Sequence, residues 1–313
     1  MSIGIAIPAL NGEKELRKLL PIVCSEPGIS DILVVDSAST DATCDVVRGF
    51  PKVRLIEIPR KEFNHGATRE LARKELATEV VVFLTQDIVP VPGFIEPLVR
   101  PILDGQAAVT YARQLPHEGA DILESFPRNY NYPPESHRRT LADAKKHGVF
   151  TFFCSDSCAA YSNSAVDSVG GITPILTNED YFTVAKLLRS GEAICYVAES
   201  RVHHSHSYSL KQEFQRYFDT GYVRGETPWV NRLVGQAEGH GAGFVRALVT
   251  QVTKTAPWKL PYAIMQSGAK WIGYRLGSIG PRLPESICLV ASAQKHYWGS
   301  IWAERASEVS RRR

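Results

Sequence analysis

The first ninety residues alternate between short apolar runs and amphipathic stretches. The apolar runs predict strands at residues 3–7, 32–36, 53–58 and 80–84. The stretches between them predict helices at residues 13–23, from residue 42 and at residues 66–75. Apolar strands that alternate with helices are typical of a mostly parallel sheet covered on both faces. We therefore predict an α/β fold whose ligands gather at the carboxyl ends of the strands.

The second half of the chain is less regular. Residues 104–148 contain four prolines and scattered charges, which predicts irregular, acceptor-side structure. An apolar run at 193–202 predicts another strand, and the pattern beyond residue 210 is helical. We expect a catalytic domain at 1–230 and a helical extension at 231–313. The mixed aromatic and basic residues of the extension indicate either packing on the main domain or contact with the inner face of a membrane.

Composition narrows the classes of partner. The chain has 313 residues, 44% of them hydrophobic, and a net charge of +3 without basic stripes, which argues against nucleic-acid binding. Six cysteines without a CxxC pair and an N-terminus without a signal core predict reduced thiols in a cytoplasm. Because no run of about eighteen apolar residues occurs, we expect any membrane contact to be peripheral.

Carboxylates follow two of the predicted strands. Asp87 ends the fourth strand, where it is either a turn cap or a ligand for a divalent cation that grips a diphosphate. Asp36 ends the second strand beside Ser37 and is either a cap or an acceptor for a base or ribose. The loops after Ile7, Val35 and Leu84 are predicted to share one site.

Three histidines emerge after the apolar run that ends near Val202. The spacing of two between His204 and His206 places them on one face of an extended segment. Surface imidazoles are common, but three within four positions favour contact with a metal or a phosphate. The lone Asp87 would then have nitrogen partners.

Two further segments allow a structural and a functional interpretation. Glu179 and Asp180 precede a helical stretch, so they either cap that helix or supply a general base that takes a proton from a sugar hydroxyl. The segment from Asn64 through Gly66 to Arg69 opens another helix, and its amides and guanidinium could meet a base or phosphate.

Taken in order, these segments resemble the family-2 glycosyltransferases with the GT-A fold, and among them the bacterial rhamnosyltransferases. The similar segments are IAIPALN at 5–11, VVDSASTD at 34–41, FNHGATR at 63–69, TQD at 85–87, VHHSHSYSL at 202–210 and RYFDTG at 216–221. The likeness covers residues 1 to about 230 firmly and the C-terminal helices loosely. Most relatives carry a DxD motif, whereas Thr85 and Gln86 leave Asp87 as the only acid here.

The resemblance implies roles for individual residues. It implies a Mg²⁺ or Mn²⁺ ion held by Asp87 and His204, with His206 as a substitute, and Asp180 as the catalytic base. It further implies a donor nucleotide surrounded by Pro8, Ala9, Asn11, Asp36, Ser37, Asn64, Gly66, Arg69, Gln86 and Asp87.

The activity implied by the resemblance is an inverting transfer of L-rhamnose from dTDP-L-rhamnose to a glycan, expected to be lipid-linked, as in assembly of surface polysaccharides such as O-antigen. A UDP-hexose is the alternative donor. A metal-dependent hydrolase would need more carboxylate or histidine ligands than the strand ends offer. A non-catalytic nucleotide-binding or membrane-docking module is the remaining alternative.

Overall fold

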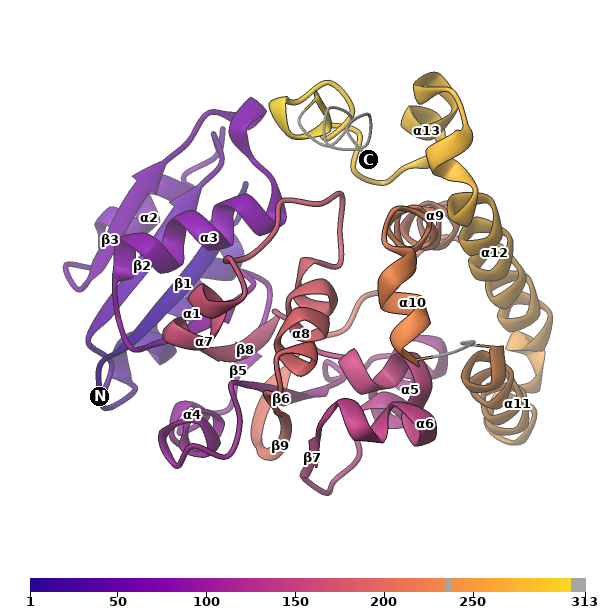
Figure 1. Cartoon of the computed structure of the whole chain (residues 1–313), viewed down its shortest axis with the longest axis horizontal. Helices are drawn as coiled ribbons and strands as arrows, with labels where there is room; N and C mark the ends of the chain where they lie inside the picture. The colour runs from indigo at the N-terminus through magenta and orange to yellow at the C-terminus, as the bar shows by residue number, and fades with distance from the viewer. Residues whose placement is uncertain (235–237, 305–313) are drawn as a thin grey trace.

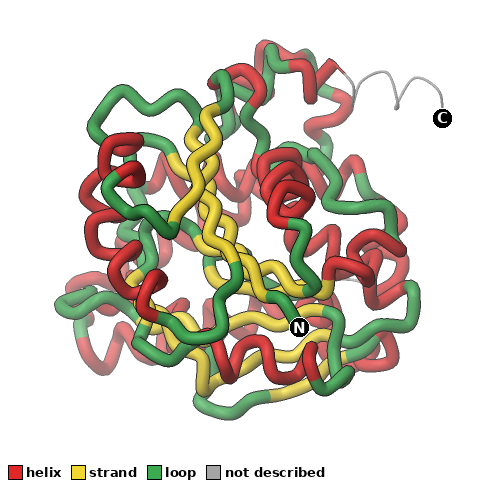
Figure 2. The backbone as a smooth tube through the Cα atoms, turned by 90° about the vertical axis from the view of Figure 1, so that its left-hand side faces the viewer, coloured by secondary structure: helices red, strands yellow, loops and turns green. Residues whose placement is uncertain are grey.

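The computed structural model describes residues 1–234 and 238–304, which form one twisted sheet with helices around it (Figures 1 and 2). The strands are β1 (Ile3–Ala9), β2 (Asp31–Asp36), β3 (Val53–Glu57), β4 (Val80–Leu84), β5 (Val89–Pro90), β6 (Val109–Leu115), β7 (His137–Arg139), β8 (Cys158–Ser162) and β9 (Ile194–His203). Their order is β3-β2-β1-β4-β8-β6-β9-β5, and β7 pairs with β9.

The main-domain helices are α1 (Glu13–Ser25), α2 (Thr43–Arg48), α3 (His65–Leu76), α4 (Ile95–Leu103), α5 (Ile122–Asn131), α6 (Ala144–His147), α7 (Asn163–Ser168) and α8 (Glu179–Arg189). The C-terminal helices are α9 (Leu210–Glu226), α10 (Pro228–Val234), α11 (Glu238–Thr255), α12 (Leu260–Ser278) and α13 (Glu285–Ala291). Single 3₁₀ turns lie at Arg60–Glu62, Leu141–Asp143, Gly148–Phe152, Pro257–Lys259 and Gly280–Arg282.

The N-terminal half of the sheet is parallel, as predicted. Strands β3, β2, β1 and β4 run in one direction. One face of the sheet buries Leu16 of α1 and Leu98 of α4, whereas the other buries Ala72 of α3 and Val184 of α8. Helices therefore cover both faces, and the carboxyl ends of β1, β2 and β4 point to one edge.

The second half of the sheet is mixed, which the sequence pattern did not predict. Strand β8 is antiparallel to both neighbours, β4 and β6, and β6 is parallel to β9. Because β8 is antiparallel to β4 and β6, the segment that precedes β8 lies at the edge where β4, β6 and β9 end. Residues just before β8 can therefore join the site.

The prediction of irregular structure at 104–148 is wrong. This stretch contains the central strand β6 and helix α5. Pro116 directly follows the last residue of β6, so it interrupts no ladder hydrogen bond. Pro127 lies inside α5. Pro116 thus borders a strand and Pro127 lies within a helix, so neither proline indicates irregular structure.

Helices α9 and α12 approach each other at glycines. A Cβ added to Gly273 would lie 2.3 Å from the Phe214 carbonyl oxygen, and one added to Gly221 would lie 2.2 Å from the Tyr274 carbonyl oxygen. The two backbones are therefore in direct contact, and α12 is fixed to the helix that follows the histidine segment. Within the described chain, no helix has the length and apolar character needed to cross a membrane. Residues 305–313 of the predicted extension lie outside the described residues.

The contact between α9 and α12 predicts opposite effects for two glycine substitutions in one helix. Gly273→Ala should lower the free energy of unfolding by about 1–3 kcal/mol, because its methyl group overlaps the Phe214 carbonyl. Gly268→Ala meets nothing within 4 Å and should raise it by about 0.5–1 kcal/mol through helix propensity. Urea unfolding measures both; equal effects would contradict the close packing.

Candidate active site

The loops after β1, β2 and β4 meet at the carboxyl edge of the sheet. Gln86 binds the backbone of Leu10 twice: its Oε1 accepts from the Leu10 amide at 2.9 Å and its Nε2 donates to the Leu10 carbonyl at 3.1 Å. The Asn11 Oδ1 accepts from the Thr40 amide at 2.8 Å. Gln86 thus uses its amide to join two loops, a task that an acid at this position could not perform in both directions.

Asp36 and its neighbours form the turn on the β2 side. The Asp36 carboxylate is buried and accepts from the Ser39 amide at 2.9 Å and from the Ser39 hydroxyl. The Ser37 amide donates to the Ala9 carbonyl at 2.9 Å. Ala9 directly follows Pro8, which is partly buried. These contacts shape the loops; contact of these residues with a nucleotide stays a prediction.

Asp87, His204 and His206 converge on one point. The Asp87 Oδ2 lies 3.1 Å from the His206 Nε2 and 3.5 Å from the His204 Nε2, and the two Nε2 atoms are 2.9 Å apart. All candidate ligand atoms lie within 4.8 Å of one another. One carboxylate and two imidazoles, gathered at such distances, match the donor set of a divalent transition-metal ion. We call these three residues the Asp-His-His cluster.

Burial and hydrogen bonding orient the cluster. The His204 Nδ1 donates to the Gln114 Oε1 at 3.1 Å, which directs its Nε2 toward Asp87. Burial lowers the pKa of His204 against the opposing effect of Asp87, so its imidazole favours the neutral, ligating form. Burial raises the pKa of Asp87, but hydrogen bonds with His204 and His206 outweigh it and hold that pKa well below its ordinary value.

A second cluster contains three acids and one buried arginine. The Arg69 guanidinium, 4% exposed, lies with its Nε 3.1 Å from the Asp156 Oδ2 and also pairs with Glu179. The Asp156 amide donates to the Asp180 Oδ2 at 3.4 Å, and the Tyr161 hydroxyl donates to the Asp156 Oδ1 at 2.7 Å. Arg69 therefore compensates charge in a group of carboxylates that would otherwise repel one another.

The surroundings of Asp180 favour its protonated form. Burial, followed by the negative charges of Asp156 and Glu179, raises the pKa of Asp180 above its ordinary value. A carboxylate with a raised pKa accepts a proton more readily, which suits a general base. The Asp180 Oδ1 also accepts from the amide of the following residue, Tyr181, at 2.6 Å within the first turn of α8, whose N-cap is Asn178.

The N-terminus of α3 positions the loop that leads to Asp180. The Asn64 Nδ2 donates to the Ile175 carbonyl at 2.8 Å while its Oδ1 caps α3 at the Ala67 amide. A Cβ on Gly66 would lie 2.4 Å from the Thr173 carbonyl oxygen, so only glycine permits this approach. Asn64, Gly66 and Arg69 thus have structural partners; their predicted contact with the nucleotide is still to be measured.

The sequence pattern did not identify the residues that lie between the two clusters. The Gln114 Nε2 donates to the Ser155 hydroxyl at 2.8 Å, so the chain of contacts runs from His204 through Gln114 to Ser155, whose neighbour Asp156 contacts Asp180. Gln114 is buried near the end of β6, but that strand also contains Thr110 and Arg113, so the sequence alone did not distinguish it. The prolines that follow β6 favoured irregular structure in this stretch, so Gln114 was not identified as a site residue.

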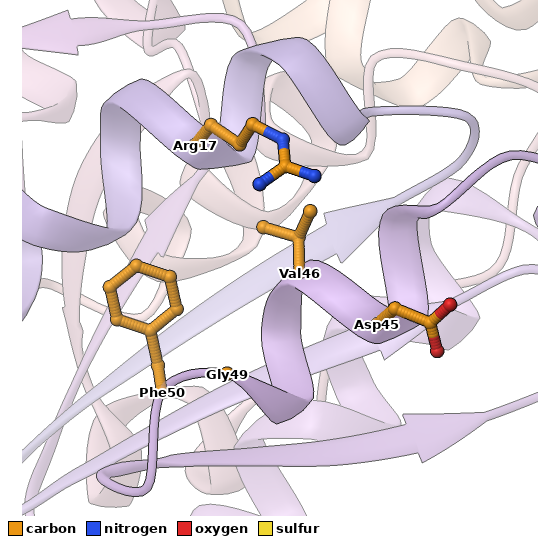
Figure 3. A pocket seen from close by; sticks show the side chains of 5 residues that line it. All are labelled: Arg17, Asp45, Val46, Gly49 and Phe50. Atoms are coloured by element: carbon orange, nitrogen blue, oxygen red, sulfur yellow. The ribbon is translucent and has the colours of Figure 1, made fainter.

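The hollow between α1 and α2 is separate from these clusters. It measures about 350 Å³ and is lined by Arg17, Asp45, Val46, Gly49 and Phe50, shown in Figure 3. It contains none of the predicted site residues and none of the residues in the two clusters. We therefore place the candidate site at the edge of the sheet.

Comparisons with known proteins identify the family of the chain. Residues 4–170 match the family described as glycosyl transferase family 2. The O-antigen chain rhamnosyltransferase RfbN of Salmonella typhimurium is 37% identical over 313 residues, which is 99% of this chain and 100% of the relative. The O-antigen chain rhamnosyltransferase WbaN of Salmonella anatum is 38% identical over 283 residues, 90% of each chain.

Solved structures resemble the fold at low sequence identity. A mannosyltransferase from Pyrobaculum calidifontis, in complex with GDP-Man and Mn²⁺, has a TM-score of 0.60 at 14% identity and covers 90% of this chain and 88% of its own. Residues 1–349 of S. aureus TarS with UDP-GlcNAc give 0.55 at 14% identity, covering 90% and 92%. The predicted GT-A type of α/β fold is confirmed.

The geometry predicts different outcomes at adjacent histidines. His204→Gln should weaken Mn²⁺ binding at least about tenfold, because it removes a cluster nitrogen. His203→Gln is the matched control: the His203 Nδ1 lies 2.9 Å from the Pro116 carbonyl, outside the cluster, so Mn²⁺ affinity should persist. Calorimetric titration of Mn²⁺ into both variants measures the two affinities. An equal loss of affinity in both variants, or no loss in either, would contradict the assignment of a metal site.

Proposed function

The chain belongs to glycosyl transferase family 2, and from that premise we propose that it transfers L-rhamnose from dTDP-L-rhamnose to a glycan hydroxyl in O-antigen synthesis. One observation supports the chemistry most: the Asp-His-His cluster and Asp180 lie at one sheet edge, linked through Ser155 and Asp156. The names of the two Salmonella relatives, one aligned along its whole length, support the sugar. The nucleotide is inferred from the motifs of the rhamnosyl branch.

The Asp-His-His cluster would hold a divalent ion, and Mn²⁺ suits two imidazoles better than Mg²⁺, which prefers oxygen ligands. When bound, such an ion neutralises charge on a departing diphosphate. Asp87 supplies the negative charge and His204 the buried, oriented nitrogen. Asp87 and His206, each about one-third exposed, leave room on the solvent side for donor oxygens.

Asp180 takes the proton in the proposed reaction. The acceptor oxygen forms a bond to the anomeric carbon of rhamnose as its proton passes to the Asp180 carboxylate. The bond between that carbon and the diphosphate oxygen breaks, and dTDP leaves with the electron pair. Because there is one displacement and one base, the anomeric configuration inverts. Asp156 and Glu179 keep the base at a raised pKa, and Arg69 limits that rise.

The acceptor is a glycan, which we propose to be lipid-linked and presented at the cytoplasmic face of the inner membrane. The relatives' names refer to the O-antigen chain, which supports a growing glycan as the acceptor class. A UDP-hexose is the alternative donor, favoured by the UDP-GlcNAc complex of the similar TarS fold. A non-catalytic nucleotide-binding or membrane-docking module is the second alternative, and the presence of both Glu179 and Asp180 argues against it.

Replacement of the base separates chemistry from binding. Asp180→Asn should reduce turnover by about two to four powers of ten while preserving donor affinity, because the amide cannot accept the proton. Initial rates of dTDP release with a glycan acceptor, and titration of dTDP in the presence of Mn²⁺, measure the two quantities.

The pH profile gives a second readout for the same residue. Since the base works deprotonated and its pKa is raised, wild-type turnover should increase with pH through an acidic limb above the ordinary aspartate pKa of about 3.9. Near-normal turnover of Asp180→Asn, or a limb at the ordinary value, would mean that another group takes the proton.

Ligand-dependent thermal stability tests the donor. With Mn²⁺, dTDP and dTDP-L-rhamnose should raise the melting temperature, because ligands that prefer the folded state stabilise it by mass action; UDP-sugars should have little effect. A preference for UDP-sugars would retain the mechanism and replace the donor. Stability unaffected by every nucleotide would overturn the transferase proposal.

A further inference from the structure

The C-terminal helices have an unusual charge distribution. The whole chain is nearly balanced, with 36 basic and 33 acidic residues, yet no Asp or Glu occurs from residue 239 to residue 284. That segment contains Arg246, Lys254, Lys259, Lys270, Arg275 and Arg282. Lys259 pairs with Asp121 and Lys270 with Glu213, both outside the segment. The segment itself presents positive charge without internal compensation.

Exposed apolar side chains gather in the same region. Of the fifteen large hydrophobic side chains exposed within the described residues, ten lie between residues 258 and 290. Trp258 is 74% exposed and Trp271 64%. Such clustering differs from the single apolar residues scattered over an ordinary protein surface.

Helix α12 turns apolar residues outward. Ile264, Trp271 and Ile272 are more than half exposed and recur at the spacing of one helical face. The opposite face is buried at Ala263, Gln266, Gly273 and Gly277. A helix that merely covers a core has polar residues on its outer face, so this arrangement indicates a partner. We call Ile264, Trp271 and Ile272 the α12 stripe.

The chemistry of the region favours lipid over a second copy of the chain. Tryptophan beside Lys and Arg is typical of segments that lie in the headgroup region of a bilayer. Anionic lipids attract each nearby Lys or Arg. A two-fold contact between copies would instead bring two identical surfaces rich in Lys and Arg together.

The fold connects this region rigidly to the candidate site. Helix α9 begins at Leu210, four residues beyond His206, and its Phe214 backbone touches Gly273 of α12. In Figure 1, α12 forms the edge of the molecule opposite β3 and α1. A surface docked through α12 would thus stand at a fixed distance from the Asp-His-His cluster.

We propose that the α12 stripe and the surrounding Lys and Arg residues dock on the surface of a bilayer containing anionic phospholipid. The inference rests on the proposed function, since it names the surface that brings a lipid-linked acceptor to the site. Docking needs neither donor nor acceptor, because it uses only apolar insertion and charge attraction.

Co-sedimentation with vesicles tests the docking. Wild-type protein should bind vesicles of phosphatidylglycerol and phosphatidylcholine, should bind pure phosphatidylcholine weakly, and should be released by about 0.5 M salt, which screens charge attraction. The triple variant Ile264→Ser, Trp271→Ser, Ile272→Ser should lose about tenfold or more in vesicle affinity. Lys254→Glu with Arg282→Glu should lose at least as much on anionic vesicles.

A charge-matched control is available on α1. Lys14→Glu with Lys18→Glu changes net charge equally at exposed positions of a helix outside the C-terminal segment, and should retain vesicle binding. Each variant should keep the wild-type melting temperature within a few degrees and its response to dTDP and Mn²⁺.

Three results would overturn the docking proposal. They are absence of binding to anionic vesicles, unchanged binding by the triple variant, and wild-type dimers in sedimentation velocity that the triple variant loses. Because the vesicles contain no glycan, their binding is independent of the reaction. Vesicle binding without any nucleotide response would instead contradict the proposed function and leave the docking surface standing.

Discussion

The buried charge of Arg69 is the interaction on which the candidate site depends. Its guanidinium pairs with Asp156 and Glu179, so it joins α3, α8 and the segment before β8 at one point. Without that cation, nothing in this cluster would compensate the negative charges of the three buried acids, which would then repel one another. Burial and the two neighbouring acids raise the pKa of Asp180, and Arg69 limits that rise. Structural support and acid–base chemistry therefore come from the same ion pairs.

Strand direction determines which residues can join this centre. The parallel strands β1, β2 and β4 bring their following loops to one edge, and the antiparallel β8 brings its preceding segment to the same edge. Gln114 at the end of β6 then contacts both His204 and Ser155. The Asp-His-His cluster and the carboxylates are thereby connected through the Gln114 side chain and the adjacent residues Ser155 and Asp156.

The sequence predicted the parts of the site that lie at recognisable strand ends. Asp87 and Asp36 followed apolar runs, and the spacing of His204 and His206 indicated that both could reach one partner. The sequence pattern could not predict that β8 is antiparallel to its neighbours, because hydrophobic periodicity carries no information on strand direction. Pro116, directly after β6, favoured irregular structure there and so concealed Gln114, and no sequence motif singled out Asp156. The immediate partners of Asn64 and Gly66 were likewise unpredictable, because they are backbone carbonyls from a loop a hundred residues away.

In the proposed reaction, the Asp-His-His cluster and Asp180 act at the two ends of one reacting bond. The most direct measurement is a crystal structure with Mn²⁺ and dTDP, in which anomalous scattering locates the metal. We expect the ion bound to Asp87 and His204, the diphosphate on its solvent side, and the Asp180 carboxylate facing the space beyond the terminal phosphate. An ion at other residues, or a diphosphate bound away from the edge where β1, β2 and β4 end, would contradict it.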